Sequence, residues 1–586
     1  MREKKEKVFD ASVFRRIMAF AFRYKAIFFG ALFSALLLAG LAALRPKLLQ
    51  YTIDTYILHK DKKGLLRYST FIFIVLLLEV LTQLVFVYLA NLLGQNVIRD
   101  MRLQVFKHII RFKKAYFDTT SIGKLVTRVV NDIETISSIF GQGLFVLISD
   151  LLKMLAILVL MFFMSVKLTL IVLVIMPIIL MATRWFQKHI KTAFQEVRTQ
   201  VAELNGFVQE RLSGMKIVQL FNREQIAYAN FKEINKKHRK AHIQTIWFYS
   251  IFFPVVEVIT TITIGLLAWY GGLQIVAETL SVGTIIAFIS MSKQLFRPLR
   301  QIADKFNTLQ MGMIASKRVF NVLDTESVII DNGTLAKEHI LGEITFEKVY
   351  FSYIPEEMVL KGVSFKINQG QKVAIVGATG AGKSTIINLL NRFYEIDAGS
   401  INLDSIPIQA YKLENLRKHV GVVLQDVFLF ADTIYHNITL GNKAITLEQV
   451  KEAAKAIGIH EFIMSLPNNY LYNIKERGIM LSSGQRQLIA FLRVYVSNPS
   501  VLVLDEATSS IDSYSEKLIQ KATAVITQGR TSIIIAHRLA TIQEADTILV
   551  MDKGKLVEQG THQELVKISN GYYKKLYEIQ FLETLK

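Results

Sequence analysis

The chain has 586 residues, of which 52% are hydrophobic, and it carries a formal net charge of +21. This length is too great for one compact core, and the absence of cysteine excludes disulfide frameworks and thiolate metal sites. Basic stretches such as Lys236–Lys240 lie between hydrophobic segments and not on a separate basic domain. That distribution favours the cytoplasmic loops of a membrane protein over nucleic-acid binding.

Residues 1–23 are expected to form an N-terminal tail followed by an elbow helix in the membrane interface. The apolar residues fall on one helical face, at Phe14, Ile17, Met18, Ala21 and Phe22. Three arginines, Arg15, Arg16 and Arg23, suit the polar face of such a helix. A cleaved signal peptide is the disfavoured alternative, since no small-residue cleavage site follows the apolar stretch.

Residues 24–325 are expected to form a transmembrane domain of six helices, because a helix needs about 20 apolar residues to cross a bilayer. The six expected spans are Ala26–Leu49, Thr70–Leu92, Leu144–Met164, Leu168–Ala182, Trp247–Tyr270 and Val282–Leu295. A soluble all-helical core is disfavoured, since it rarely contains uncharged runs like Phe71–Leu78.

The spacing of these spans predicts short external loops and two long cytoplasmic excursions. The interval Gln95–Phe145 and the interval between spans four and five are helical in pattern and rich in Lys and Arg, which places both inside, together with the two termini. The basic loop Lys60–Arg67 falls outside and departs from this tendency. Turns are expected at Ser121–Gly123 and near Asn205–Gly214, at the tips of the two excursions.

Beyond a linker at residues 326–341, short strands alternate with helices, so residues 342–586 are expected to form an α/β domain. The buried-strand pattern Lys372–Val376 leads into a glycine-rich loop, and the helix-favouring run Ile386–Leu390 follows. This is a P-loop in its strand–loop–helix setting, whose backbone amides surround phosphate oxygens. We expect Lys383 to reach the β- and γ-phosphates and Ser384 to ligate Mg²⁺. The expected nucleotide-binding residues of the loop are Gly377, Thr379, Gly380, Gly382, Lys383, Ser384 and Thr385.

A second buried strand, Val501–Leu504, ends in the adjacent carboxylates Asp505 and Glu506. Two carboxylates at the end of a strand can divide the chemistry of phosphoryl transfer. We expect Asp505 to hold Mg²⁺ and Glu506 to polarise the attacking water as the catalytic base.

Between these motifs lies Leu481-Ser482-Ser483-Gly484-Gln485, which resembles the signature of ATP-binding cassette (ABC) proteins, usually Leu-Ser-Gly-Gly-Gln. The chain as a whole resembles the type IV ABC exporters, the group that contains bacterial multidrug and lipid A exporters. The resemblance implies a half-transporter with a helical membrane domain and an α/β cassette. It also implies ATP-driven export through a multi-pass protein of a bacterial cytoplasmic membrane.

Further motifs stand in the order typical of this family. Tyr353 resembles the aromatic residue that stacks on adenine, and Gln425 resembles the glutamine that senses Mg²⁺ and the γ-phosphate. Asp512 matches the D-loop, and His537, which follows the strand pattern Ser532–Ile535, matches the switch histidine. The resemblance implies that Gln425 and His537 take part in catalysis. Glu476-Arg477-Gly478 matches the X-loop of exporters.

The segments at the two excursion tips also resemble this family, whose intracellular loops carry coupling helices. Phe117-Asp118 is similar to the first intracellular loop, and Asn205–Gly214 is similar to the second. In the family, one coupling helix docks on its own cassette and the other on the partner's.

The resemblance implies that a second half-transporter is needed, because the signature of one cassette completes the P-loop of the other. Ser482, Ser483, Gly484 and Gln485 would then contact the partner's ATP. Two residues depart from the family pattern: Ser483 replaces a glycine, and Leu488 replaces a common arginine. Both a homodimer and a heterodimer fit; a homodimer is favoured because every catalytic position is filled.

The transported substrate is the least determined part of the interpretation. Glu79 and Glu257 lie within apolar spans, where carboxylates are functional candidates. Each could contact a cationic substrate or pair with a basic neighbour. Export of a small amphipathic molecule, a lipid or a drug, is favoured, with membrane lipid as a partner; a peptide exporter and an ATP-gated channel or regulator remain alternatives.

Overall fold

The computed structural model describes residues 10–505, 513–536 and 539–578. The chain divides into two compact units. The first comprises Met1–Ile110 and Thr120–Glu326, and the second comprises Arg111–Thr119 and Ser327–Lys586. The short segment Arg111–Thr119 thus packs with the C-terminal unit, although it lies within the expected membrane domain.

The first unit is entirely helical in its described part, and its long helices exceed the thickness of a bilayer. The helix α3 has 48 residues, which at 1.5 Å per residue is roughly 70 Å, against a hydrocarbon core of about 30 Å. Its α-helices are α1 (Ala11–Ala21), α2 (Lys25–Thr52), α3 (Lys62–Ile109), α5 (Ile122–Thr127), α6 (Ile133–Ser138), α7 (Phe145–Met164), α8 (Val166–Ser213), α9 (Met215–Leu220), α10 (Glu224–Val276) and α11 (Val282–Leu323).

Five helical stretches of the described chain are long and apolar enough to cross a membrane: Ala11–Ile57, Lys62–Ile109, Ile122–Met164, Val166–Ser213 and Glu224–Val276. They contain the first five expected spans. The sixth expected span, Val282–Leu295, forms the start of α11 but is not among them. Lys293 lies within this span and Arg297 lies just beyond it, and these two charges lower the mean hydropathy of the segment.

The expected elbow helix is α1, and Asp10 caps it by accepting a hydrogen bond from the backbone N–H of Ser12. Its buried face consists of Val13, Ile17 and Ala21. The expected apolar stripe included Phe22, but that side chain is 44% exposed. The α-helix ends at Ala21 and a 3₁₀ turn begins, which rotates Phe22 away from the buried face.

The tips of the excursions differ in detail from the prediction. α3 ends at Ile109, and a separate short helix, α4 (Lys114–Thr119), follows. The chain then breaks at Ser121, at the expected turn; Ser121 is extended at the N-cap position of α5, without a capping hydrogen bond from its side chain. The second tip is α9, so it follows Gly214 instead of preceding it. Residues 205–213 continue α8, and Asn222, with φ of +51°, closes the turn.

The second unit contains a six-stranded and a four-stranded sheet. The larger has the order β10-β9-β3-β8-β7-β6, in which only β10 runs antiparallel to its neighbour. Its strands are β3 (Lys372–Gly377), β6 (Val420–Val423), β7 (Val501–Asp505), β8 (Thr531–Ile535), β9 (Thr547–Asp552) and β10 (Lys555–Gly560). The expected strands at residues 372–376, 501–504 and 532–535 are thereby confirmed.

The smaller sheet is antiparallel, in the order β2-β1-β4-β5. Its strands are β1 (Ile344–Ile354), β2 (Glu357–Ile367), β4 (Ala398–Leu403) and β5 (Ile406–Pro407). The α-helices around the two sheets are α12 (Lys383–Leu390), α13 (Leu413–His419), α14 (Ile434–Thr439), α15 (Leu447–Ile457), α16 (His460–Ser465), α17 (Ser483–Ser497), α18 (Ser513–Thr527), α19 (Leu539–Gln543), α20 (His562–Lys567) and α21 (Tyr572–Tyr577).

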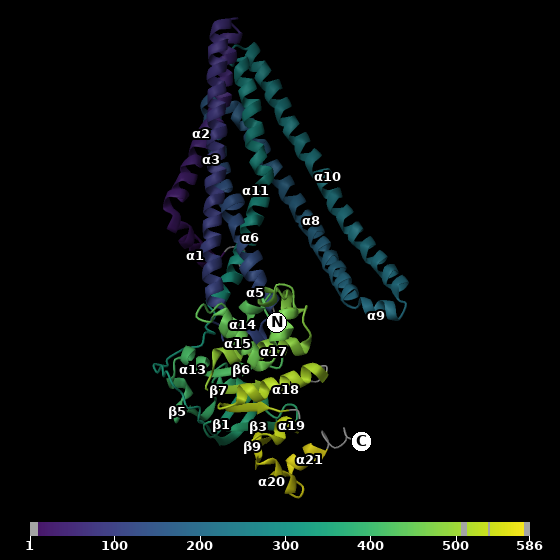
Figure 1. Ribbon diagram of the computed structural model, residues 1–586. Coiled ribbons are helices and arrows are strands. Elements are labelled where there is room, and N and C mark those ends of the chain that lie inside the picture. Colours follow the sequence, from purple (N-terminus) through teal and green to yellow (C-terminus); the bar gives the residue numbers. More distant parts are fainter. Residues whose placement is uncertain (1–9, 506–512, 537–538, 579–586) are drawn as a thin grey trace. The chain divides into compact units, whose positions relative to one another are not determined.

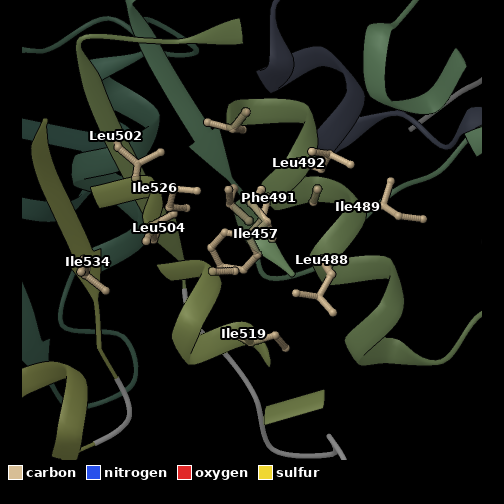
Figure 2. Close-up of a cluster of buried hydrophobic side chains, with 14 of the residues drawn as sticks. Ile457, Leu488, Ile489, Phe491, Leu492, Leu502, Leu504, Ile519, Ile526 and Ile534 are labelled. Atoms are coloured by element: carbon tan, nitrogen blue, oxygen red, sulfur yellow. The ribbon is translucent and has the colours of Figure 1, made fainter. Parts of the chain in front are cut away.

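One large apolar core joins α15, α17 and α18 to the parallel sheet. Leu488 and Phe491 of α17 belong to the same buried cluster as Leu502 and Leu504 of β7 (Figure 2). Leu488 is 2% exposed. Its replacement of the family's arginine therefore adds an apolar side chain to the core, worth roughly 2 kcal/mol of burial.

Candidate functional site

The loop between β3 and α12 has the backbone form of a phosphate-binding loop. Glycine at position 377 lets the loop take this form without a clash, since a Cβ there would lie 2.2 Å from the carbonyl oxygen of Met551. Gly382 has φ of +99°, a left-handed conformation that disfavours other residues, and it directly precedes the first residue of α12. Thr379 and Gly380 lie exposed between them, at the surface a phosphate would approach.

Lys383 is a buried cation at the base of this loop. Its ammonium group donates to the carbonyl oxygens of Gly377 at 2.7 Å and Ala378 at 3.0 Å. Burial lowers the pKa of Lys383, and the charge of Asp505 acts in the opposite direction. Carbonyl oxygens compensate a full charge only partly, so phosphate oxygens would be stronger partners for this ammonium group.

The first turn of α12 carries the other expected phosphate and metal ligands. Ser384 is exposed, whereas Thr385 is 5% exposed. The hydroxyl groups of Thr385 and Tyr353 lie 3.2 Å apart, and the side-chain amide of Asn388 donates to Tyr353 at 3.2 Å. The aromatic residue expected to stack on adenine is thus brought from β1 to the P-loop helix.

The parallel strands bring the other segments that the sequence predicts to be catalytic to one edge. β3, β8, β7 and β6 are neighbours, so their carboxyl ends lie along the same side of the sheet. Asp505 is the last residue of β7, and Gln425 follows β6 on an exposed segment. Glu506, Asp512 and His537 lie outside the described residues, but Glu506 directly follows β7.

The signature segment forms the start of α17. Ser482 is the N-cap: its hydroxyl accepts from the backbone N–H of Gln485, whose side chain accepts from the N–H of Ser482. Ser482 and Ser483 are exposed, and Gly484 is buried. α17 packs against α14, α15, α18 and the edge strand β6.

Two residues near Tyr353 had no signal that singled them out in the sequence. Tyr394 lies at 5.0 Å from the ring of Tyr353 in an edge-on arrangement, and its hydroxyl donates to Asp118 of α4. Burial, together with that hydrogen bond, raises the pKa of Tyr394. Lys114 of α4 donates to Asn388 at 3.5 Å. Only the resemblance of Phe117-Asp118 to a coupling segment pointed to this contact of α4 with the α/β unit.

The two carboxylates of the expected spans are each paired with an arginine. Glu79 of α3 lies 3.6 Å from Arg45 of α2, and Glu257 of α10 lies 3.5 Å from Arg300 of α11. The structure therefore supports the second of the two readings given for these residues, that of pairing with a basic neighbour.

Comparisons with known proteins agree with both units. A family model described as the ABC transporter transmembrane region matches residues 28–299, and one described as ABC transporter matches residues 360–509. A putative multidrug export ATP-binding/permease protein of Bacillus subtilis is 34% identical over 97% of this chain and 100% of its own length.

Two other matches are of the same kind. An ATP-dependent lipid A-core flippase of Legionella pneumophila is 34% identical, with 84% of each chain covered. The solved structure of a bacterial Atm1-family ABC exporter with ATP bound superimposes with a TM-score of 0.75 at 28% identity, covering 98% of this chain and 99% of that one. With a helical membrane unit and an ATP-binding α/β unit in one chain, this multi-pass membrane protein belongs to the ABC transporter family, as an exporter that couples ATP hydrolysis to transport.

Proposed function

We propose that two copies of this chain assemble into an exporter in the cytoplasmic membrane of a bacterium. The exporter moves a small amphipathic molecule, a lipid or a drug, outward from the cytoplasm or from the inner leaflet of that membrane. The observation that carries the proposal is the phosphate loop between β3 and α12, with Lys383 buried at its base. Each chain contributes one membrane unit and one cassette, so a second half-transporter is needed to form a transporter with two of each. ATP-driven closure of the cassettes then switches the access of the membrane units.

In this proposal each ATP lies between the P-loop of one chain and the signature of its partner. Gly377, Gly380 and Gly382 let the loop follow the phosphates, Lys383 neutralises them, and Tyr353 stacks on adenine. Across the interface, Ser482, Ser483, Gly484 and Gln485 reach the γ-phosphate, which the N-terminal dipole of α17 also favours. Glu506 polarises the attacking water, and His537, Gln425 and Asp512 complete the site.

The residues at the edge of the sheet also fit a magnesium ion. Mg²⁺ prefers hard oxygen ligands and binds through one or two protein groups together with the substrate phosphates. The exposed hydroxyl of Ser384, the carboxylate of Asp505 and the side-chain oxygen of Gln425 are such groups. When bound, the ion would supply charge neutralisation at the β- and γ-phosphates.

The surroundings of Ser483 and Leu488, the two residues that depart from the family pattern, favour a homodimer over a heterodimer. Ser483 begins a helix whose capping box is intact, and Leu488 fills the apolar core. Neither change removes a group that the proposed mechanism uses. Export of a peptide or gating of a channel has no specific observation in its favour here.

The decisive experiment is to purify this chain alone and reconstitute it in liposomes. We expect a dimer with Mg²⁺-dependent ATPase activity and uphill transport, both of which are lost in Glu506→Gln and on chelation of Mg²⁺. If the purified chain is an inactive monomer, the proposed homodimer is wrong and a heterodimer takes its place. Ion conductance that persists in Glu506→Gln, with no transport by the wild type, would overturn the exporter in favour of a channel.

A further inference from the structure

The helical unit contains a cavity of about 530 Å³ between α8, α10 and α11. This volume lies within the range of roughly 300–1,000 Å³ that holds drug-sized ligands. α8 and α10 run alongside each other (Figure 1), and Phe186 of α8 contacts Phe252 of α10 at 5.4 Å between ring centroids. Phe252 is itself part of the cavity wall.

The cavity begins where the apolar segments of these helices give way to polar ones, and it extends along the polar parts of α8 and α11 as far as Arg198 and Ile314. On α8 the wall begins at Gln187, just beyond Trp185, and on α10 it includes Tyr249, just after Trp247. Tryptophan and tyrosine concentrate at the boundary between lipid and water. The orientation expected from the sequence, with both long excursions inside, puts this boundary on the cytoplasmic side, where the cavity opens next to the inner leaflet.

The charges of the wall are predominantly positive. Lys191, Arg198 and Arg300 line the cavity, against a single carboxylate, Asp304. Arg300 is engaged with Glu257, whereas in the described part of the chain Lys191 and Arg198 have no carboxylate partner.

Beside these cations the wall is aromatic and apolar. Phe194 and Phe306 line the cavity while each is more than 40% exposed, at 43% and 49%, so their rings are accessible to a ligand. Met311 and Ile314 extend the apolar part along α11. An occupant that satisfies both parts of the wall has an anionic head and an apolar body.

We propose that this cavity binds an amphipathic anion, with a phosphate or carboxylate head between Lys191 and Arg198 and its apolar body against the aromatic wall, and that the exporter transports this class of molecule. The inference rests on the proposed function for the transport step, but not for binding. It replaces the cationic substrates that Glu79 and Glu257 suggested, since arginines already pair with both carboxylates.

The test compares two amphiphiles of equal chain length, dodecyl phosphate and dodecyltrimethylammonium, below their micelle-forming concentrations. Binding to the purified dimer in zwitterionic nanodiscs is followed by tryptophan fluorescence, with empty nanodiscs subtracted. We expect dodecyl phosphate to bind at least about tenfold more tightly, and Lys191→Gln/Arg198→Gln to remove that preference. Lys188→Gln, an exposed lysine of α8 outside the cavity wall, is the matched control and should keep it.

A charge-reversed variant separates a lost site from a misfolded protein. Lys191→Glu/Arg198→Glu should favour dodecyltrimethylammonium, whereas misfolding would abolish both interactions. Equal binding of the two amphiphiles to the wild type, or an unchanged preference in either double variant, would overturn the proposal. Competition by phosphatidylglycerol in the nanodisc would assign the anion to a membrane lipid; binding without competition would assign it to a soluble amphiphile.

Because binding is measured without ATP, its failure is distinct from a failure of ATP-driven export. If ATPase activity and transport of another compound are intact while dodecyl phosphate does not bind, only the anion assignment falls. If dodecyl phosphate binds but is not transported by the active exporter, the site stands and the substrate assignment is overturned.

Discussion

Two helices of the α/β unit begin in opposite ways, although both belong to segments that the proposed mechanism places at a phosphate. α12 follows Gly382 in a left-handed conformation, and no side chain caps its first turn. The first turn of α17 is closed by a capping box. The backbone N–H of Gln485 donates to the hydroxyl of Ser482 at 3.2 Å, and the backbone N–H of Ser482 donates to the side chain of Gln485 at 3.0 Å.

The difference concerns which backbone donors remain for a ligand. The first amides of a helix lack partners within the helix, so they bind caps, water or anions. In α12 no side chain takes up these donors, so they are available to the proposed phosphate, with the ammonium group of Lys383 at the base of the same loop. In α17 the side chains of Ser482 and Gln485 already accept hydrogen bonds from two of these backbone N–H groups. The start of the signature helix is therefore stabilised before a partner chain binds. The two N-termini should therefore respond differently to mutation.

The largest effect is expected at the uncapped helix. Lys383→Ala removes the one full charge identified at the base of the loop, and ATPase activity should fall by about 100-fold or more. Lys366→Ala, an exposed lysine that pairs with Glu343 in the smaller sheet, serves as the control and should retain activity. Steady-state hydrolysis by the reconstituted protein measures both. Comparable loss in the two variants would mean that lysine removal acts through folding.

The next effect concerns the glycines that shape the same loop. Gly377→Ala puts a Cβ against the carbonyl of Met551, so the free energy of unfolding should fall by about 2–3 kcal/mol. At Gly380 the backbone has φ of +82°, which disfavours alanine, but nothing lies within 4 Å of the new Cβ. Gly380→Ala should therefore lower the free energy of unfolding by only about 1 kcal/mol. Thermal unfolding in detergent compares them. Equal losses would show that steric contact with Met551 is relieved by movement of β9.

Much of this site could be predicted from the sequence because its chemistry is local. A buried strand followed by glycines and a lysine specifies β3, the loop and α12 within a few residues. The position of Asp505 could be predicted because it directly follows the buried strand pattern Val501–Leu504. The order of the strands in the sheet joins these segments, and no local pattern encodes it.

What could not be predicted depends on packing between distant segments. Tyr394 reads as an ordinary core aromatic until the fold places it between Tyr353 and Asp118. The arginine partners of Glu79 and Glu257 lie on other helices, so one helix's pattern cannot reveal them. The tip near Gly214 was misplaced because the polar residues before it suit a helix as well as a turn.

A smaller effect is expected at the capped helix, and a second capping box gives a matched control. Ser482→Ala should lower stability by about 1 kcal/mol and ATPase activity by about tenfold, because it removes both a cap and a proposed contact with the partner's ATP. Thr446 caps α15 with Gln449 in the same reciprocal way. Thr446→Ala should cost the same stability but leave ATPase activity intact. Equal activity in the two variants would reduce Ser482 to a purely structural cap.

The smallest effect is expected at Ser483, the residue that departs from the family signature. It is already the first residue of α17, with the capping box intact around it, so its backbone conformation does not require glycine. Ser483→Gly should change ATPase activity by less than about threefold and lower stability by less than about 1 kcal/mol. Hydrolysis by the purified homodimer measures the first, and thermal unfolding the second. A rise in activity of about tenfold or more would mean that the serine side chain obstructs the partner's phosphate, and that this signature belongs to the impaired site of a heterodimer.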